Sequence, residues 1–219
     1  MKIAVILAGC GRFDGSEIHE SVLTLLSIEQ NNATWQCFSL DLPQQHITNH
    51  LTEETLKTTE PRNMLLESAR IARGNVKDLT KLNVNDFDAL IIPGGNGIAY
   101  NLFTLALEGK NYTVNALVKK TCLDFTKANK PVGFICIAPA MIPGIYGSGI
   151  ELTIGTDQTT IELLTTIGAK HFNCLVDEIH IDQNKKIVTT PAYMLAKNIV
   201  EAYSGIKKLV DSVVKLATN

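Results

Sequence analysis

Cys136 is the side chain of this sequence best placed for nucleophilic chemistry. It follows the apolar run 132–135 and precedes Ile137, with Pro139 shortly after. This pattern predicts a buried strand, a sharp turn and a helix with Pro in its first turn. A thiol at that junction would lie at the positive end of a helix dipole and could ionise near neutral pH. The same geometry exposes the nucleophile in other acyl-transfer folds. The alternative is a buried core thiol.

Two glutamates offer acid–base chemistry beside such a thiol. Glu17 and Glu20 are three residues apart in a predicted helix over residues 16–30, so they share a face of its first turn. One of them could point into a cleft, accept a hydrogen bond from the thiol or shuttle a proton. The alternative is ordinary N-terminal helix charge. Ser16 is the expected N-cap of this helix, and one apolar face is expected to carry Ile18, Val22, Leu25 and Leu26.

A glycine pair could supply the donors for an oxyanion. Gly94 and Gly95 follow the predicted strand 88–92 and Pro93. The backbone N–H of Gly95, together with that of Ile137, could stabilise a developing negative charge beside Cys136. The alternative is a turn that needs a positive φ angle.

The remaining cysteines and histidines restrict the chemistry. No His follows Cys136 directly, and no His/carboxylate cluster has the spacing of a metal site. His19 lies beside the two glutamates. Cys10, in the first loop, is a possible redox partner of Cys136. Three cysteines are expected to be inert: Cys37, Cys122 and Cys174.

The first loop, residues 9–15, invites comparison with dinucleotide-binding loops, and Asp41 follows the second predicted strand. Its spacing is G-x-G-x-x-x-G, whereas the dinucleotide fingerprint is G-x-G-x-x-G. Arg12 and Asp14 would also crowd a pyrophosphate. A tight turn that leads into the next helix is the simpler interpretation.

Strands and helices alternate along the chain, which predicts an α/β fold with a doubly wound, mostly parallel sheet in one domain, residues 1–219. The predicted strands are 2–8, 35–40, 88–92, 132–135, 151–154, 177–181 and 186–190. The predicted helices are 16–30, 62–73, 114–127, 160–166, 194–203 and 206–217. Residues 41–60 lack a core pattern and are expected to form an insertion or flap.

The composition excludes several classes of partner. The chain has 219 residues, 45% hydrophobic and 19% charged, with a net charge of −2. The small net charge argues against a basic surface for nucleic acid and against a polybasic membrane patch. No apolar run is long enough to span a bilayer. Five scattered cysteines without a CxxC pair are typical of a reduced, cytoplasmic protein.

Taken together, these residues resemble the PfpI-type branch of the class I glutamine-amidotransferase-like superfamily. Within it, the chain most resembles the ElbB-like subgroup, the isoprenoid biosynthesis glyoxalases. The resemblance covers essentially the whole chain. It is carried by residues 9–11, 14–20, 62–63, 67–74, 93–95, 136–140 and 189–194.

The resemblance implies a flavodoxin-like three-layer sandwich, no organic cofactor and a homodimer. It implies Cys136 as a strained nucleophile, Glu20 as the helix glutamate that contacts the thiol, with Glu17 as the fallback, and backbone N–H groups of Gly95 and Ile137 as oxyanion donors. The implied activity is that of a lyase which converts a small reactive aldehyde, glyoxal, into glycolate.

This sequence departs from the wider family at one point. Protease- and amidotransferase-like members place a His directly after the Cys or on a late loop, whereas Ile137 follows Cys136 here and the late loop 153–157 contains none. This departure argues against peptidase and glutaminase activity. The alternative function is a redox-sensing or carbonyl-scavenging regulatory or chaperone-like protein that uses the same cysteine.

Overall fold

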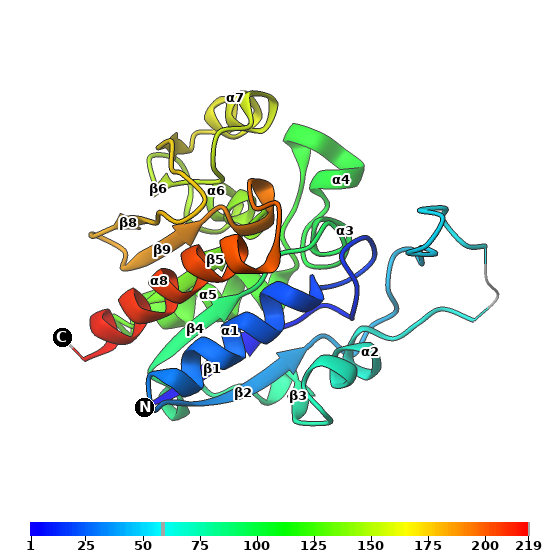
Figure 1. Cartoon of the computed structure of the whole chain (residues 1–219), viewed down its shortest axis with the longest axis horizontal. Helices are drawn as coiled ribbons and strands as arrows, with labels where there is room; N and C mark the ends of the chain where they lie inside the picture. The colour runs from blue at the N-terminus through cyan, green and yellow to red at the C-terminus, as the bar shows by residue number, and fades with distance from the viewer. Residues whose placement is uncertain (58–59, 219) are drawn as a thin grey trace.

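The sheet has seven strands in the order β3-β2-β1-β4-β5-β9-β8 (Figure 1). We describe a computed structural model that covers residues 1–57 and 60–218. The strands are β1 (Lys2–Ile6), β2 (Thr34–Ser39), β3 (Val76–Asp78), β4 (Ala89–Ile92), β5 (Val132–Ile135), β8 (His180–Asp182) and β9 (Ile187–Thr190). All neighbours pair in parallel except β8, which runs antiparallel to β9. The predicted α/β fold with a mostly parallel sheet is confirmed.

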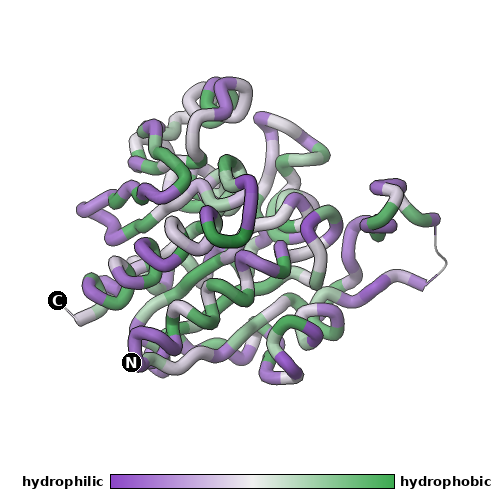
Figure 2. Tube along the Cα trace, in the orientation of Figure 1, coloured by the Kyte–Doolittle hydropathy of each residue, from purple (hydrophilic) through white to green (hydrophobic). Residues whose placement is uncertain are grey.

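Helices cover both faces of this sheet. On one face α1 (Ile18–Gln30) packs beside α8 (Ile199–Ala217), and on the other lies α5 (Ala116–Lys127) (Figure 1). Strand alternation supplies both interfaces, because Ile3 faces the α1 and α8 layer whereas Ala4 faces the α5 layer. The central strands are correspondingly hydrophobic along their length (Figure 2).

Shorter elements complete the chain. A separate two-stranded sheet consists of β6 (Glu151–Leu152) and β7 (Lys170–His171). The other α-helices are α2 (Met64–Ile71), α3 (Ile98–Asn101), α4 (Leu105–Glu108), α6 (Ile142–Tyr146) and α7 (Gln158–Thr166). The 3-10 turns are η1 (Leu79–Lys81), η2 (Val84–Asp86), η3 (Gly109–Asn111), η4 (Ala138–Met141) and η5 (Ala192–Met194). Within residues 1–57 and 60–218, no helix is long and apolar enough to cross a membrane.

The predicted core face of α1 is wrong in most of its members. Ile18, Val22 and Leu26 are 42%, 47% and 43% exposed, and of the predicted four only Leu25 is buried. Leu23 and Ile28 join Leu25 in the core, and small hydroxyl side chains are buried beside them: Ser21, Thr24 and Ser27. Each donates a hydrogen bond to the carbonyl four residues earlier, so these polar groups can be buried without an unmet hydrogen bond.

The N-cap of α1 is Glu17 and not Ser16. The Glu17 carboxylate accepts a hydrogen bond from the backbone N–H of Glu20 at 2.7 Å. The Ser16 hydroxyl instead accepts the backbone N–H of Ala8 at 2.9 Å, which attaches the end of the first strand segment to the start of the helix. The tertiary contact takes the side chain that local sequence would assign to the cap.

The two helices predicted near the C-terminus are in fact one, α8. The predicted segment 194–203 begins instead as the 3-10 turn η5, and the helix starts at Ile199. Asn198 determines this start, because its side chain accepts the backbone N–H of Glu201 at 2.9 Å.

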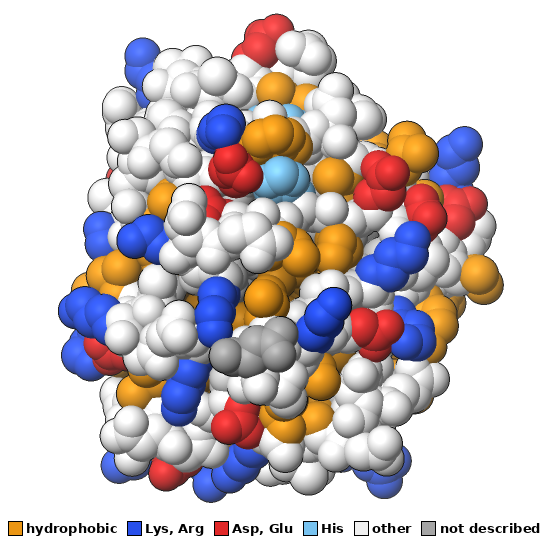
Figure 3. All heavy atoms as spheres, turned by 90° about the vertical axis from the view of Figure 1, so that its left-hand side faces the viewer, with side chains coloured by type: hydrophobic (Ala, Val, Ile, Leu, Met, Phe, Trp, Pro, Cys, Tyr) orange, Lys and Arg blue, Asp and Glu red, His pale blue; other side chains and the backbone are white. Residues whose placement is uncertain are grey.

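On the face shown in Figure 3, basic and acidic side chains are interspersed, in keeping with the small net charge.

Within the predicted insertion 41–60, the described residues 41–57 and 60 extend outward between β2 and α2 (Figure 1). Their described part holds the first loop in place. The side chain of Gln44 donates to the carbonyl of Asp14, and the backbone N–H of Thr48 donates to the Asp14 carboxylate at 2.9 Å. Asp14 is fully buried, with Arg62 3.8 Å from its carboxylate. Action as a flap stays a prediction, and residues 58–59 of the segment lie outside the described residues.

The close approach of two loops requires glycine at position 97. A Cβ on Gly97 would lie 1.8 Å from the backbone nitrogen of Gly15. Its φ of −60° is open to any residue, so the requirement is purely steric. We expect Gly97→Ala to lower the free energy of unfolding by about 3 kcal/mol. Gly147→Ala, with a positive φ but no atom within 4 Å, should cost only about 1 kcal/mol. Urea denaturation followed by Trp35 fluorescence measures both, and equal losses would contradict the steric explanation.

Candidate active site

Cys136 occupies a strained turn between β5 and η4. Its φ is +62°, a left-handed conformation that costs a residue with a side chain about 1–3 kcal/mol. Its backbone N–H donates to the carbonyl of Thr190 on the neighbouring strand at 2.9 Å. Gly94 packs against it so closely that a Cβ there would lie 2.5 Å from the Cys136 Cβ. The surrounding backbone therefore maintains the strained turn, and the side chain is only 6% exposed.

Glu20 is the glutamate that contacts the thiol. It is fully buried in the first turn of α1, and its carboxyl group is hydrogen-bonded to the Cys136 side chain. Two backbone groups hold the carboxyl in place: the N–H of Gly94 donates to Oε2 at 2.9 Å, and the N–H of Tyr193 donates to Oε1 at 3.2 Å. Of the two candidate glutamates, geometry therefore selects Glu20. Glu17 lines the same cleft, and its charge acts on Glu20.

Burial controls the protonation of this pair. Desolvation, and then the charge of Glu17, raises the pKa of Glu20 to about 8. Desolvation, and then the charge of Glu20, raises the pKa of Cys136 well above its usual value. The expectation of a thiol that ionises near neutral pH on a helix dipole is therefore wrong. The element after Cys136 is a short 3-10 turn, and the sulfur is buried beside a carboxyl group.

The two predicted oxyanion donors both point at the sulfur. The backbone N–H groups of Gly95 and Ile137 donate to Cys136, and each lowers its pKa. Groups that stabilise negative charge on sulfur are also positioned to stabilise an oxyanion on an atom bound to it. Gly95 has a φ of +109°, and a Cβ there would lie 2.5 Å from the backbone nitrogen of Glu17, so only glycine fits.

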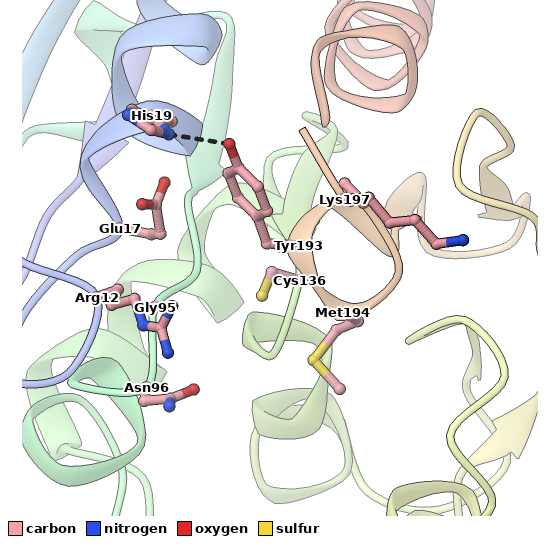
Figure 4. A pocket seen from close by; sticks show the side chains of 10 residues that line it. Arg12, Glu17, His19, Gly95, Asn96, Cys136, Tyr193, Met194 and Lys197 are labelled. Atoms are coloured by element: carbon pink, nitrogen blue, oxygen red, sulfur yellow. Dashed lines mark hydrogen bonds between the residues drawn. The ribbon is translucent and has the colours of Figure 1, made fainter. Parts of the chain in front are cut away.

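A cleft of about 510 Å³ opens in front of Cys136 (Figure 4). It is lined by Arg12, Glu17, His19, Gly95, Asn96, Cys136, Tyr193, Met194, Ala196 and Lys197. Nδ1 of His19 lies 2.9 Å from the hydroxyl of Tyr193, so this imidazole is hydrogen-bonded to that phenol. Cys10 is not among the lining residues, and both Cys10 and Cys136 are free thiols, so a redox pairing of the two stays a prediction.

Several cleft residues were not predicted from the sequence. Tyr193 both lines the cleft and holds Glu20 through its backbone, and its place in the matched segment 189–194 was an available signal. Arg12 was considered only as an obstacle to a pyrophosphate. Lys197 carried no signal, because it lies beyond the matched segment 189–194.

Known proteins resemble this chain over nearly its full length. It is 40% identical over 224 residues to the human glutamine amidotransferase-like class 1 domain-containing protein 3, mitochondrial, a match that spans 98% of this chain and 83% of the human protein. No protein-family profile matches. The human protein is named as mitochondrial, whereas the cytoplasmic location of this chain stays a prediction, as does the homodimer.

Solved structures share the fold. An isoprenoid biosynthesis protein with an amidotransferase-like domain from Ehrlichia chaffeensis has a TM-score of 0.91 and 35% identity, covering 99% of both chains. Glyoxalase III from Candida albicans has a TM-score of 0.63 at 12% identity, covering 99% of this chain and 97% of that one. At that identity the second likeness shows the fold alone.

The raised pKa of Glu20 predicts a pH-dependent cost to stability. An unfolded glutamate loses its proton near pH 4.5, whereas folded Glu20 keeps it to about pH 8. The contribution of the Glu20 proton to the free energy of unfolding is therefore fully present below pH 4.5. It is lost as the pH rises to about 8. Relative to Glu20→Gln, the wild type should lose up to about 1.4 kcal/mol per pH unit in this window.

Urea denaturation between pH 4.5 and 9 measures this slope. Gln keeps one acceptor oxygen but cannot titrate, so its lost hydrogen bond adds an offset that does not vary with pH. Glu162→Gln, at an exposed position on α7, is the matched control and should follow the wild-type curve. Parallel curves for the wild type and Glu20→Gln would show that the pKa of Glu20 is not raised.

Proposed function

The chain belongs to the glutamine amidotransferase-like class 1 domain family, and from this we propose that it is a cofactor-independent glyoxalase-type enzyme that converts glyoxal into glycolate through Cys136. One observation carries the proposal. The thiol is hydrogen-bonded to a buried carboxyl with a pKa of about 8, while two backbone N–H groups point at the same sulfur. The shared fold with a glyoxalase III gives support by analogy.

The first step joins the sulfur to the aldehyde. As Sγ of Cys136 attacks one carbonyl carbon, the thiol proton moves to the Glu20 carboxylate and the carbonyl oxygen becomes an oxyanion. The N–H groups of Gly95 and Ile137 stabilise that oxyanion. Return of the proton from Glu20 to the oxygen gives a neutral hemithioacetal, so the thiol never has to ionise before the substrate is bound.

The second step moves hydrogen between the two carbons. The Glu20 carboxylate removes the proton from the carbon bound to sulfur and leaves an enediolate. After a proton exchange between the two oxygens, Glu20 returns its proton to the neighbouring carbon, and the product is a glycolyl thioester. Water then cleaves the thioester and releases glycolate and the free thiol. A carboxyl with a pKa of about 8 suits these transfers, because a general acid–base group works best near the operating pH.

Cysteine replacement tests the nucleophile. We expect Cys136→Ala and Cys136→Ser to form glycolate from glyoxal only at the background rate of the assay, with circular dichroism spectra like that of the wild type. Cys10→Ala, which alters a cysteine outside the cleft lining, should retain turnover. Glyoxalase activity that persists in Cys136→Ala would refute the mechanism.

Glu20→Gln tests the proton shuttle. Loss of a general acid–base group should lower kcat about 10²–10⁴-fold. In the wild type, kcat/KM should rise with pH as the pair loses its first proton, with an apparent pKa of about 8, and this rise should disappear in Glu20→Gln. A variant with wild-type kcat and an unchanged pH profile would assign the proton transfer to another group.

The same groups around the sulfur suit a second function, redox sensing, because Glu20 and the two N–H donors could hydrogen-bond the oxygens of an oxidised cysteine. Mass spectrometry after mild peroxide treatment, measured beside glyoxal turnover, separates the two. For an enzyme with a buried, protonated thiol we expect turnover without selective oxidation of Cys136. Selective oxidation with negligible turnover would favour the sensor.

A further inference from the structure

The cleft in front of Cys136 is far larger than glyoxal needs. Its volume of about 510 Å³ falls in the range of about 300–1,000 Å³ that holds drug-sized ligands. Its two walls each carry a cation. In Figure 4, Arg12 lies on the wall with Gly95 and Asn96, whereas the side chain of Lys197, on the opposite side with Met194, extends away from Cys136. A longer substrate with an anionic end would match both the size and the charge.

Arg12 is held in position by its backbone and by its neighbour. Its carbonyl accepts the backbone N–H of Gly97 at 3.2 Å, which ties the first loop to the oxyanion loop. Its guanidinium carbon lies 4.1 Å from the centre of the Phe13 ring. Because both the backbone and the flat group are supported, the guanidinium is partly pre-organised beside the cleft.

The ionic partner of Arg12 leaves it available for a ligand. Glu53 approaches it only to 3.9 Å, and the two side chains are 59% and 66% exposed. Such a solvent-exposed pair contributes little. A carboxylate in the cleft could form two parallel hydrogen bonds with the guanidinium, which is a stronger arrangement.

The other charges of the cleft fit the same ligand. Among the lining residues, Glu17 is the only acid, and its carboxylate already caps α1. Lys197 is anchored by its backbone N–H, which donates to Glu201 at 2.9 Å. Within the described part of the chain, its ammonium group has no hydrogen-bonding or ionic partner. Because the side chain of Lys197 extends away from Cys136 in Figure 4, Arg12 is the cation of the lining that is placed to meet a substrate.

We propose that the enzyme takes 2-oxoaldehydes with a carboxylate at the far end, and that Arg12 is the specificity residue that binds this carboxylate. This inference rests on the proposed function. The aldehyde lies at Cys136, and the reaction becomes R–CO–CHO + H₂O → R–CHOH–COOH by the steps given above. A phosphate ester on the adjacent carbon is a poorer choice, because the enediolate would expel phosphate.

A matched pair of substrates tests the specificity. 4,5-Dioxopentanoate carries the carboxylate, and 2-oxopentanal has the same carbon chain without it. We expect the wild type to prefer the anion at least about tenfold in kcat/KM, as for a charged hydrogen bond. Arg12→Met should lower this ratio about tenfold, Arg12→Lys should restore part of it, and added salt should reduce it. Lys77→Met, on the edge strand β3, should leave the ratio unchanged.

A binding measurement separates this inference from the proposed chemistry. Calorimetry with 2-hydroxyglutarate, the product, should show binding to Cys136→Ala that weakens at least about tenfold when Arg12→Met is added. Turnover of 2-oxopentanal with no preference for the anion, and binding independent of Arg12, would overturn this inference and leave the glyoxalase intact. Binding that depends on Arg12, without turnover of either compound, would keep the anion site and refute the glyoxalase chemistry.

Discussion

The hydrogen bond between the Cys136 thiol and the Glu20 carboxyl is the contact on which the site depends. Both groups are buried, so neither ionises easily, and each determines the charge that the other can carry. The arrangement differs from a Cys–His pair, in which an imidazole removes the thiol proton in advance. Here desolvation, and then the charge of Glu20, raises the pKa of the thiol, so ionisation before a substrate binds is disfavoured.

This contact imposes close packing on the surrounding backbone. Glu20 can reach the sulfur only because Gly94 lies between the two without a side chain. Gly95 must then adopt a positive φ to aim its N–H at the sulfur, and Gly97 must touch the first loop. The same loop carries Arg12 to the cleft wall. Nucleophile, carboxyl, oxyanion donors and the proposed carboxylate-binding residue are therefore parts of one packed junction at the carboxyl ends of β1, β4 and β5, where open α/β sheets bind ligands.

The protein thus provides a protected acid–base pair at the base of a cleft that is much larger than the pair itself. On the proposed mechanism, the small reactive centre can act on any vicinal dicarbonyl. The proposed carboxylate site at Arg12, in the larger outer part, would select among such compounds by what they carry at the other end. On this proposal, chemistry and specificity are located in different residues, and a change at Arg12 would alter the substrate without altering the steps at Cys136.

Local patterns determined most strands, most helices, the turn at Cys136 and the glycine loop, because hydrophobic periodicity and glycine or proline at turns act over a few residues. Local patterns missed three features that depend on partners distant in the chain. These are the edge strand β3, the buried face of α1, and the single helix α8 where two helices were predicted. The choice of Glu20 over Glu17 was also tertiary in origin. Both are equally good first-turn acids, and only the positions of Gly94, Cys136 and Tyr193 decide which one is buried against the sulfur. The raised pKa values follow from that burial, which no spacing in the sequence can express.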